Sequence, residues 1–240
     1  MDLDKMVFPA NRCLCLLSCW YRSKKLRRSR SFFVFQDMNF PEDALLLTEH
    51  GDAPEMEPGK TLLLDANVMA AAITNIAQAI ISEFPEEHLP EIALVGIQLR
   101  GVPFASRLAE QIAAKTGRRP LCGSIDINMY RDDIGMRKML PVIRETSLPF
   151  DVNGRILILA DDVLQTGRTI RAALDALNSY GRPSLIRLAA LLDRGLREYP
   201  IRADYTGKLC ELPREKRIKV YWQELDGEDT VYTLDRTQKT

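Results

Sequence analysis

Short, uninterrupted apolar runs that alternate with helical segments constrain the fold of this chain more than any other feature. The runs are IALVGI (92–97), RILILA (155–160) and SLIRLAALL (184–192). Each has the length and composition of a strand that is covered on both faces. The segments with helical spacing or with helix start and stop signals are 65–84, 102–117 and 167–181. RIKVYWQEL (217–225) alternates and predicts one further strand. Strands alternating with helices form right-handed crossovers, so we expect an α/β fold with a parallel sheet.

The size and charge of the chain limit the class of protein. Its 240 residues suit one α/β domain with a short appendage, and its 33 basic and 33 acidic side chains give a net charge near zero. This balance argues against a general nucleic-acid coat protein but leaves a local basic patch open. The cysteines are Cys13, Cys15, Cys19, Cys122 and Cys210. Their scatter shows no zinc spacing and fits a reducing cytoplasm, so we expect a cytoplasmic protein.

The first sixty residues differ in composition from the rest. Apolar runs at 13–21 and 31–35 flank the basic stretch YRSKKLRRSR, and the linker HGDAPEMEPGK follows at 50–60. The apolar runs are shorter than the roughly 20 residues of a membrane helix, and most positive charges follow the first run instead of preceding it as in a signal peptide. We therefore expect 1–60 to be a poorly ordered leader and linker. A membrane-surface anchor and a basic arm are the alternatives.

A Thr-Gly-Arg-Thr turn, 166–169, opens one of the predicted helices. Gly167 lets the backbone approach a ligand, and the helix that follows directs free N–H groups and its positive dipole end toward that ligand. The hydroxyls of Thr166 and Thr169 add donors, so the turn is a candidate site for a phosphate monoester. An ordinary strand-to-helix turn with a threonine N-cap is the alternative. The Walker spacing is absent, which argues against an ATPase.

Two adjacent acids, Asp161 and Asp162, lie between the apolar run and this turn. A buried pair of carboxylates would not stay doubly ionised, so we expect both acids at a surface where they meet hydroxyls or a cation. A ribose 5-phosphate spans the gap, with its phosphate on the turn and its 2′- and 3′-hydroxyls on the carboxylates. A magnesium ion held through water is a further possibility.

ILILADDVLQTGRTI (156–170) resembles the 5-phosphoribosyl-1-diphosphate (PRPP) motif of type I phosphoribosyltransferases. GIQLRGVPFASRLAEQI, DINMYRDDI, DDVLQTGRTIRAALDAL and LDRGLREYPIRADYTGK resemble the PyrR family of pyrimidine operon attenuation regulators and uracil phosphoribosyltransferases. The resemblance runs from about Leu62 to about Thr233. It implies the type I phosphoribosyltransferase fold over 61–240: a central parallel twisted sheet flanked by helices, with a small hood subdomain and a flexible loop.

The resemblance also implies a role for each segment at the strand ends. The diphosphate loop would be Leu99, Arg100 and Gly101. The remaining PRPP-binding residues would be Asp161, Asp162, Val163, Leu164, Gln165, Thr166, Gly167, Arg168 and Thr169. The catalytic residues would be Arg131, Asp161 and Asp162. Arg131 stands at the base of the flexible loop, roughly Asp132–Pro149, whose Arg137, Lys138 and Arg144 add positive charge. The backbone at Asp193 and Arg194 would recognise uracil.

The implied reaction is uracil plus PRPP giving UMP and diphosphate, with Mg²⁺ entering as the PRPP complex and no direct protein ligand to the metal. The transition state should have oxocarbenium character. Purine phosphoribosyltransferases with a similar motif carry an aspartate base at the position of Gln165, and glutamine cannot take a proton in that way. This favours a pyrimidine substrate, and we assign no general base.

The competing functions are binding of a pyrimidine-operon leader RNA and sensing of PRPP or UMP without turnover. The family's RNA-contacting positions are matched at Thr74, Arg197, Arg202 and Lys208. Asn75, Gln78 and Leu196 stand where RNA-binding members carry basic or imidazole side chains, so the proposed face has lost charge. The resemblance also implies a homodimer or higher homo-oligomer.

Overall fold

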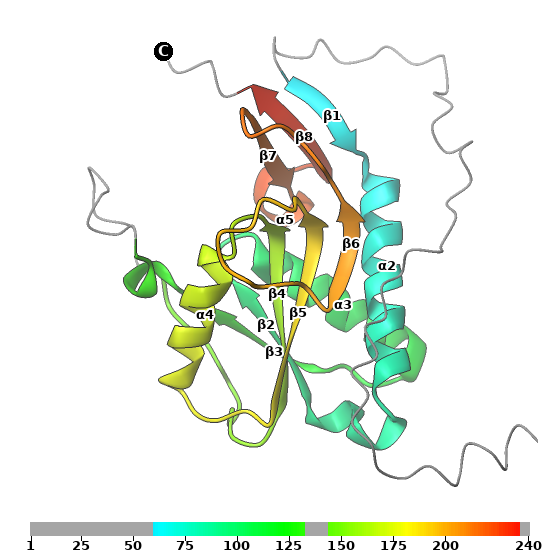
Figure 1. Ribbon diagram of the computed structural model, residues 1–240. Helices are drawn as coiled ribbons and strands as arrows, with labels where there is room; N and C mark the ends of the chain where they lie inside the picture. The colour runs from blue at the N-terminus through cyan, green and yellow to red at the C-terminus, as the bar shows by residue number, and fades with distance from the viewer. Residues whose placement is uncertain (1–59, 133–143, 236–240) are drawn as a thin grey trace, which may run out of the picture. The chain divides into compact units, whose positions relative to one another are not determined.

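The computed structural model describes residues 60–132 and 144–235. A five-stranded parallel sheet of order β3-β2-β4-β5-β6 lies at its centre (Figure 1). Its strands are β2 (Ile92–Ile97), β3 (Leu121–Ile125), β4 (Ile156–Leu164), β5 (Leu185–Asp193) and β6 (Tyr205–Leu209). Strand order reverses beside β2, since β3 lies on one side of it and β4 on the other. In open parallel sheets, ligands bind at the carboxyl ends of strands next to such a reversal.

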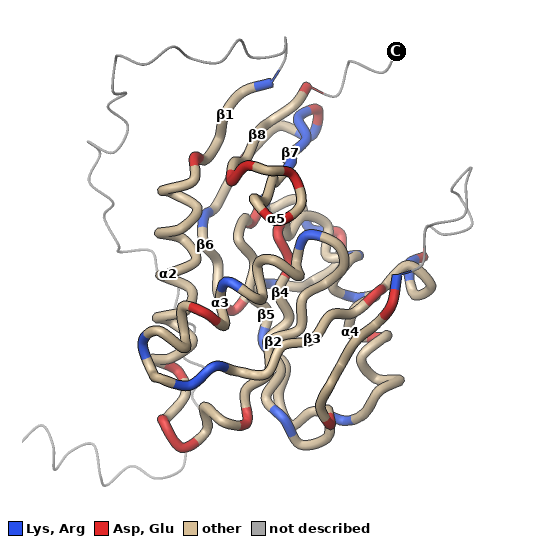
Figure 2. The backbone as a smooth tube through the Cα atoms, turned by 180° about the vertical axis from the view of Figure 1, so that it is seen from behind, with Lys and Arg blue, Asp and Glu red and all other residues tan. Residues whose placement is uncertain are grey.

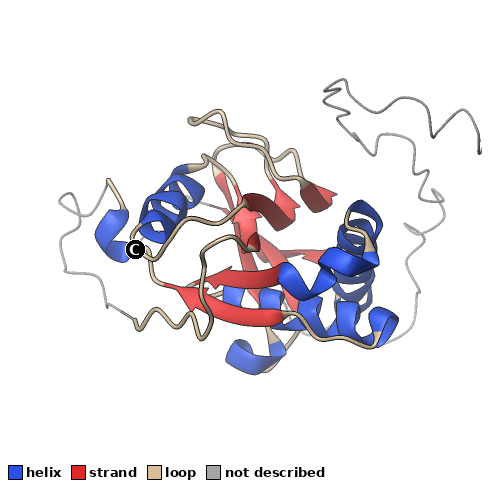
Figure 3. Cartoon of the chain, turned by 90° about the horizontal axis from the view of Figure 1, so that it is seen from below, coloured by secondary structure: helices blue, strands red, loops and turns tan. Residues whose placement is uncertain are grey.

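Helices cover both faces of this sheet, as Figure 3 shows from below. The helices α2 (Ala66–Glu83) and α3 (Gly101–Thr116) share one apolar cluster with Ile158, while α4 (Arg168–Asn178) shares the opposite cluster with Leu157 and Leu159. Alternate residues of β4 thus face opposite layers, and all three are fully buried. Burial on both faces explains why this strand reads as an uninterrupted apolar run.

A second, antiparallel sheet of order β1-β8-β7 stands beyond the carboxyl ends of the parallel strands (Figure 1). Its strands are β1 (Lys60–Leu64), β7 (Lys216–Tyr221) and β8 (Thr230–Asp235), and the short helix α5 (Gln223–Asp226) follows β7. We call this sheet with α5 the hood. Trp222 is fully buried and stacks on Phe104 of α3, with ring centroids 6.2 Å apart. Arg107 of α3 reinforces the junction with ion pairs to Glu224 and Asp229.

The α/β fold, the parallel sheet and the small hood expected from the sequence are confirmed, as are the three predicted helices. Asp65 caps α2 by accepting a hydrogen bond from the Val68 N–H at 2.8 Å, and Gly117 ends α3 in a left-handed conformation. The strand predicted at 217–225 is confirmed, but it is shorter than predicted. The strand ends at Tyr221, and it belongs to the antiparallel hood because its alternating side chains leave one face exposed.

Two 3₁₀ helices, Glu86–Glu91 and Asn128–Tyr130, complete the described elements. Within 60–132 and 144–235, no helix has the length and hydropathy needed to cross a bilayer. Residues 1–59 of the predicted leader and linker lie outside the described residues, whereas Lys60 begins β1. The part of the predicted flexible loop at 133–143, with Arg137 and Lys138, also lies outside them. The last part of that loop is fixed: Ser147 and Ser124 of β3 exchange backbone hydrogen bonds of 2.8 and 2.9 Å.

Candidate active site

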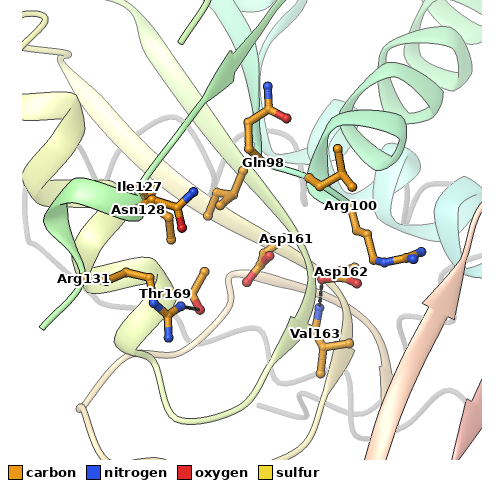
Figure 4. A pocket seen from close by; sticks show the side chains of 11 residues that line it. Gln98, Arg100, Ile127, Asn128, Arg131, Asp161, Asp162, Val163 and Thr169 are labelled. Atoms are coloured by element: carbon orange, nitrogen blue, oxygen red, sulfur yellow. Dashed lines mark hydrogen bonds between the residues drawn. The ribbon is translucent and has the colours of Figure 1, made fainter. Parts of the chain in front are cut away.

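A pocket of about 290 Å³ lies where β2 and β4 end and α3 begins. Figure 4 shows Asp161 near its centre, with Arg131 and Thr169 on one side and Asp162 and Arg100 on the other. Seven of the residues that the sequence assigned to PRPP binding or catalysis line this pocket: Leu99, Arg100, Arg131, Asp161, Asp162, Val163 and Thr169. The strand ends therefore bring together side chains that lie up to 70 positions apart (99 to 169) in the chain.

The two acids lie within β4, near its carboxyl end, because the strand continues through Leu164 instead of ending at residue 160. Asp161 is only 6% exposed, so the expectation that both acids lie at a surface was wrong for this residue. Burial, with the neighbouring charge of Asp162, raises the pKa of Asp161 well above its usual range. Burial also raises the pKa of Asp162 to about 6, although the positive charge of Arg100 opposes this shift. Burial thus disfavours the ionised form of both acids, and hydrogen bonds donated by a ligand would stabilise that form.

Within 60–132 and 144–235, these acids have no further carboxylate or imidazole beside them that would complete a metal site. Among the described residues, no three His, Cys, Asp or Glu side chains are grouped so that they could hold a metal ion. Asp162 accepts one hydrogen bond from the Val163 N–H at 3.0 Å, which fixes its orientation and leaves its second oxygen for other donors. Hard carboxylate oxygens of this kind suit Mg²⁺ held through water or sugar hydroxyls.

The loop at the start of α3 approaches the acids closely because it contains Gly101. A methyl group at this position would lie 2.3 Å from the carbonyl oxygen of Ala160 and 3.5 Å from the Cα of Asp161. The peptide bond between Gln98 and Leu99 is cis. No side chain caps α3, so the first N–H groups of this helix remain available at the pocket.

The guanidinium of Arg100 points from this loop toward the hood. Its two terminal nitrogens donate to the carboxylate of Asp226 at 2.6 and 2.9 Å, and Nη1 also donates to the Val220 carbonyl. Only about a quarter of the Arg100 side chain is exposed. The hydrogen bonds to Asp226 raise the pKa of Arg100 further, so this cation stays charged within the field of Asp162.

The phosphate turn, which we define as residues 166–169, follows β4 directly. Gly167 adopts φ +88° as the N-cap of α4, a left-handed conformation that favours glycine, and no side chain caps this helix. The alternative of a threonine N-cap is therefore wrong. Thr166 accepts a hydrogen bond from the Arg168 N–H at 3.3 Å, and Arg131 donates to the Thr169 hydroxyl at 3.4 Å. Apart from the Arg168 N–H, the N–H groups of the first helical turn remain available to an anion.

Arg168 binds the two segments beside the turn and does not line the pocket. It donates to Glu198 at 2.6 Å and to Asp132, and its guanidinium lies 5.4 Å from the ring of Tyr199. Of the other motif residues, Leu164 is buried and Gln165 half-buried, and neither lines the pocket.

Four lining residues were not assigned from the sequence: Ile97, Gln98, Ile127 and Asn128. Gln98 donates to the Ser124 hydroxyl at 3.3 Å and to the Glu145 carbonyl at 3.4 Å. Ile127 and Asn128 follow β3, whose sequence LCGSI is too polar and small to have been recognised as a strand. The rule that ligands bind beyond the carboxyl ends of parallel strands would have found both residues, but β3 itself was not recognised in the sequence.

The segment assigned to uracil follows β5 and lies outside the lining of the pocket. The carboxylate of Asp193 accepts hydrogen bonds from the Gly195 N–H at 2.9 Å and from Arg197 at 2.5 Å. Arg194 is 4% exposed and donates to the carbonyls of Pro213 and Lys216. The side chain of Arg194 is thus committed to the fold, which leaves its backbone as the group available to a base.

The four positions assigned to RNA have different environments. The Thr74 hydroxyl bonds to the Ala70 carbonyl and to Gln111, and the guanidinium of Arg197 is surrounded by acceptors of the chain. Arg202 and Lys208 are exposed. Of the four positions, Arg202 and Lys208 are therefore the ones that present positive charge to solvent.

Known proteins resemble this chain over the same region. The family model described as a phosphoribosyl transferase domain matches residues 61–224. The bifunctional protein PyrR of Pelotomaculum thermopropionicum is 46% identical over 179 residues, which cover 75% of this chain and 98% of that relative. The bifunctional protein PyrR of Roseiflexus sp. is 48% identical over 169 residues, covering 70% and 91%.

Among solved structures, a hypoxanthine phosphoribosyltransferase of Staphylococcus aureus has the same fold. It aligns with a TM-score of 0.55 at 20% identity and covers 73% of this chain and 92% of its own. At that identity the likeness concerns the fold alone. Together with the domain match and the two closer relatives, these findings show that the chain is a phosphoribosyltransferase and belongs to the PyrR family of bifunctional proteins.

Proposed function

We propose that the pocket at the ends of β2 and β4 is where this chain makes UMP and diphosphate from uracil and PRPP. One observation carries the proposal: the buried acid pair, two arginines and the loop that leads into α3 line a single cavity, next to the start of α4. The acid pair can accept hydrogen bonds from ribose hydroxyls, and the N–H groups at the two helix starts can bind phosphates.

In this proposal, Asp161 and Asp162 accept hydrogen bonds from the 2′- and 3′-hydroxyls of the ribose. The hydroxyls of Thr166 and Thr169 and the N–H groups at the start of α4 bind the 5-phosphate. These contacts fix the sugar at both ends, so that its anomeric carbon is held for attack by the base. Negative charge close to the sugar also favours an oxocarbenium-like transition state.

The diphosphate lies, in the same proposal, against Leu99, Arg100 and Gly101, with Arg131 facing it across the pocket. Mg²⁺ carried by PRPP supplies additional neutralisation of the leaving group. The guanidinium of Arg100 is bound to Asp226, so its contribution is a fixed positive field beside Asp162 together with the backbone N–H groups of the loop. Arg131 is the lining cation placed at the base of the predicted flexible loop.

Uracil is held by backbone groups at Asp193 and Arg194, whose side chains are bound within the protein. No side chain is assigned as a general base. Gln165 is half-buried beside the phosphate turn and has no acid function to offer a purine. The base site thus fits a pyrimidine that needs positioning more than deprotonation.

The decisive assay measures steady-state UMP formation from uracil and PRPP, with orotate and hypoxanthine as competing acceptors. We expect turnover with uracil and none above background with the other two bases. Binding of UMP and PRPP without turnover would instead identify a nucleotide sensor that uses the same pocket. Faster transfer to hypoxanthine would contradict the pyrimidine assignment.

A second candidate function, binding of a pyrimidine-leader RNA, is favoured by the exposed positive charges of Arg202 and Lys208. Strand β6 lies against α2, since Gly207 packs on Ala72 and Ile76. Thr74, Asn75 and Gln78 lie on α2. Lys208 is exposed and follows Gly207 in β6, and Arg202 is exposed in the loop before this strand. Helix α2 itself contains neither lysine nor arginine and is tan along most of its length in Figure 2.

Restoring charge to this face should strengthen RNA binding. We expect the double variant Asn75→Arg and Leu196→His to bind a pyrimidine-leader hairpin more tightly than the parent, with a steeper dependence on salt, because each added phosphate contact releases counterions. Asn75 is exposed and Leu196 half-buried, and neither lines the pocket, so UMP formation should stay near the parent rate. Gel-shift titrations at two salt concentrations, run beside the UMP assay, measure both effects. Tight, hairpin-specific binding by the parent would contradict the view that the neutral residues have weakened this face.

A further inference from the structure

Arg197 has a position that neither the RNA assignment nor the pocket explains. Its Nε donates to the carbonyl of Ile201 at 2.7 Å, and its Nη2 donates to the carboxylate of Asp193 at 2.5 Å. Its Nη1 donates to the carbonyls of Gln165 at 2.8 Å and Leu164 at 3.3 Å. The planar guanidinium thus meets acceptors on three separate stretches of chain, and only 20% of the side chain is exposed.

The stretches that Arg197 joins are those that hold the two reacting partners in the proposed function. Leu164 and Gln165 end β4 and lead directly into the phosphate turn. Asp193 ends β5 and opens the segment proposed to bind uracil. Figure 1 shows the loop between β5 and β6 extending across the end of β4 toward the start of α4.

On either side of Arg197, backbone hydrogen bonds attach the same loop to the end of β4 and to the phosphate turn. The Arg194 N–H donates to the Leu164 carbonyl, and the N–H groups of Glu198 and Tyr199 both donate to the Thr166 carbonyl, each at 2.9 Å. None of these bonds reaches the carboxylate of Asp193. Among the described residues, Arg197 is the side chain that connects this carboxylate to Leu164 and Gln165, directly before the phosphate turn.

We propose that Arg197 is a positioning residue for uracil transfer: its guanidinium locks the uracil segment to Leu164 and Gln165, which lead into the phosphate turn, so that the base and the 5-phosphate are held at a fixed separation. This inference rests on the proposed function, because it takes the two segments to be the base site and the phosphate site. A fixed separation matters because a displacement of about 1 Å at a reacting centre can slow transfer a hundredfold. Arginine suits the task, since its fork offers five donors in one plane, whereas lysine offers a single compact charge.

These contacts distinguish Arg197 from Arg202, which lies five positions later in the same loop. Arg202 is exposed, and within the described parts of the chain its side chain makes no hydrogen bond or ion pair. A role in RNA binding needs donors that face solvent, as those of Arg202 do. Arg202→Gln is therefore the matched control for Arg197→Gln, because it removes the same charge from the same loop.

The test compares the parent, Arg197→Gln, Arg197→Lys and Arg202→Gln in the full chain. We expect Arg197→Gln to raise KM for uracil by about tenfold or more at saturating PRPP, as for the loss of a charge-assisted hydrogen-bond network. Arg202→Gln should keep the parent values. A merely structural role would lower the melting temperature and the active fraction, and hence kcat, while leaving KM for uracil unchanged. Arg197→Lys should lie closer to Arg197→Gln than to the parent when the KM values for uracil are compared on a logarithmic scale, because a lysine cannot reach all the acceptors.

Calorimetry with UMP and with ribose 5-phosphate provides a second measurement that needs no turnover. Arg197→Gln should weaken UMP binding by about tenfold and ribose 5-phosphate binding much less, because only UMP spans both segments. Parent-like uracil KM and UMP affinity in folded Arg197→Gln would overturn the proposal. If that variant does not fold, the same outcome in Arg197→Lys overturns it. Should the parent make no UMP, the proposed function fails by itself, while the comparison of the two ligands still tests Arg197.

Discussion

Replacing Asp162 with asparagine should lower kcat/KM for PRPP by about ten- to a hundredfold while making the folded protein more stable near neutral pH. The kinetic loss is that of a charge-assisted hydrogen bond to the ribose, roughly 1.5–3 kcal/mol. The side chain keeps its shape, and the amide oxygen can still accept the hydrogen bond from the Val163 N–H. The effects on activity and stability therefore have opposite signs.

The gain in stability follows from the pKa of Asp162, which burial raises to about 6 in the folded protein. In the unfolded chain an aspartate titrates near 3.9, roughly two units lower. The folded state thus binds the proton more tightly, and stability falls as pH rises through this interval. Above it, the ionised group destabilises the fold by up to about 3 kcal/mol. Asparagine carries no charge and removes this penalty, so the difference between variant and parent should grow from pH 4 toward neutrality.

Denaturant unfolding at pH 5 and near pH 8, together with UMP formation at varied PRPP, measures both effects. Asp175→Asn is the control, because this acid is 44% exposed on α4 in an ion pair with Arg171 and its loss should change stability by well under about 1 kcal/mol. Unchanged PRPP kinetics in folded Asp162→Asn would falsify the ribose assignment. A destabilised variant near neutral pH would contradict the burial of an unfavourable charge.

The sequence predicted those strands whose surroundings are apolar on both faces. β2, β4 and β5 are such strands, and their boundaries differ from the predicted ones by one residue or less, apart from the carboxyl end of β4. That end was placed too early because Asp161 and Asp162 interrupt the apolar run although the backbone continues in the sheet. β3 was missed because Leu121–Ile125 is an edge strand with exposed and half-buried positions. For 217–225, alternation indicated a strand but could not tell which sheet it joins.

The candidate site divides in the same way. Its acids, glycine and threonines belong to one continuous motif, so their grouping could be read from the sequence. The partners of the arginines could not be predicted from the sequence. Arg100 meets Asp226, which comes 126 residues later, and Arg197 meets backbone carbonyls, which carry no sequence signal at all. Resemblance assigned Arg197 to RNA by position, whereas its contacts depend on how the loop between β5 and β6 folds back on β4.

Gly101→Ala should impair the use of PRPP more than any other single methyl group added to the described site. The new methyl would lie 2.3 Å from the carbonyl oxygen of Ala160 and 3.3 Å from its carbonyl carbon, both in the backbone of β4. Neither atom can rotate away, so the loop must move outward from Asp161. We expect kcat/KM for PRPP to fall by about a hundredfold, because a shift of about 1 Å misplaces the diphosphate relative to the acids. Overpacking of this kind should also reduce stability by about 1–3 kcal/mol.

Gly117→Ala, at the other end of α3, separates this steric effect from a general weakening of the helix. Gly117 has φ +71°, and nothing lies within 4 Å of a methyl group placed there. Its replacement therefore introduces backbone strain of about 1–2 kcal/mol without displacing the diphosphate loop. Both variants should melt at lower temperature than the parent, but only Gly101→Ala should show a raised KM for PRPP in the fraction that remains folded. If the two variants lose activity in proportion to their stability alone, close approach of the loop to Asp161 is not what PRPP binding requires.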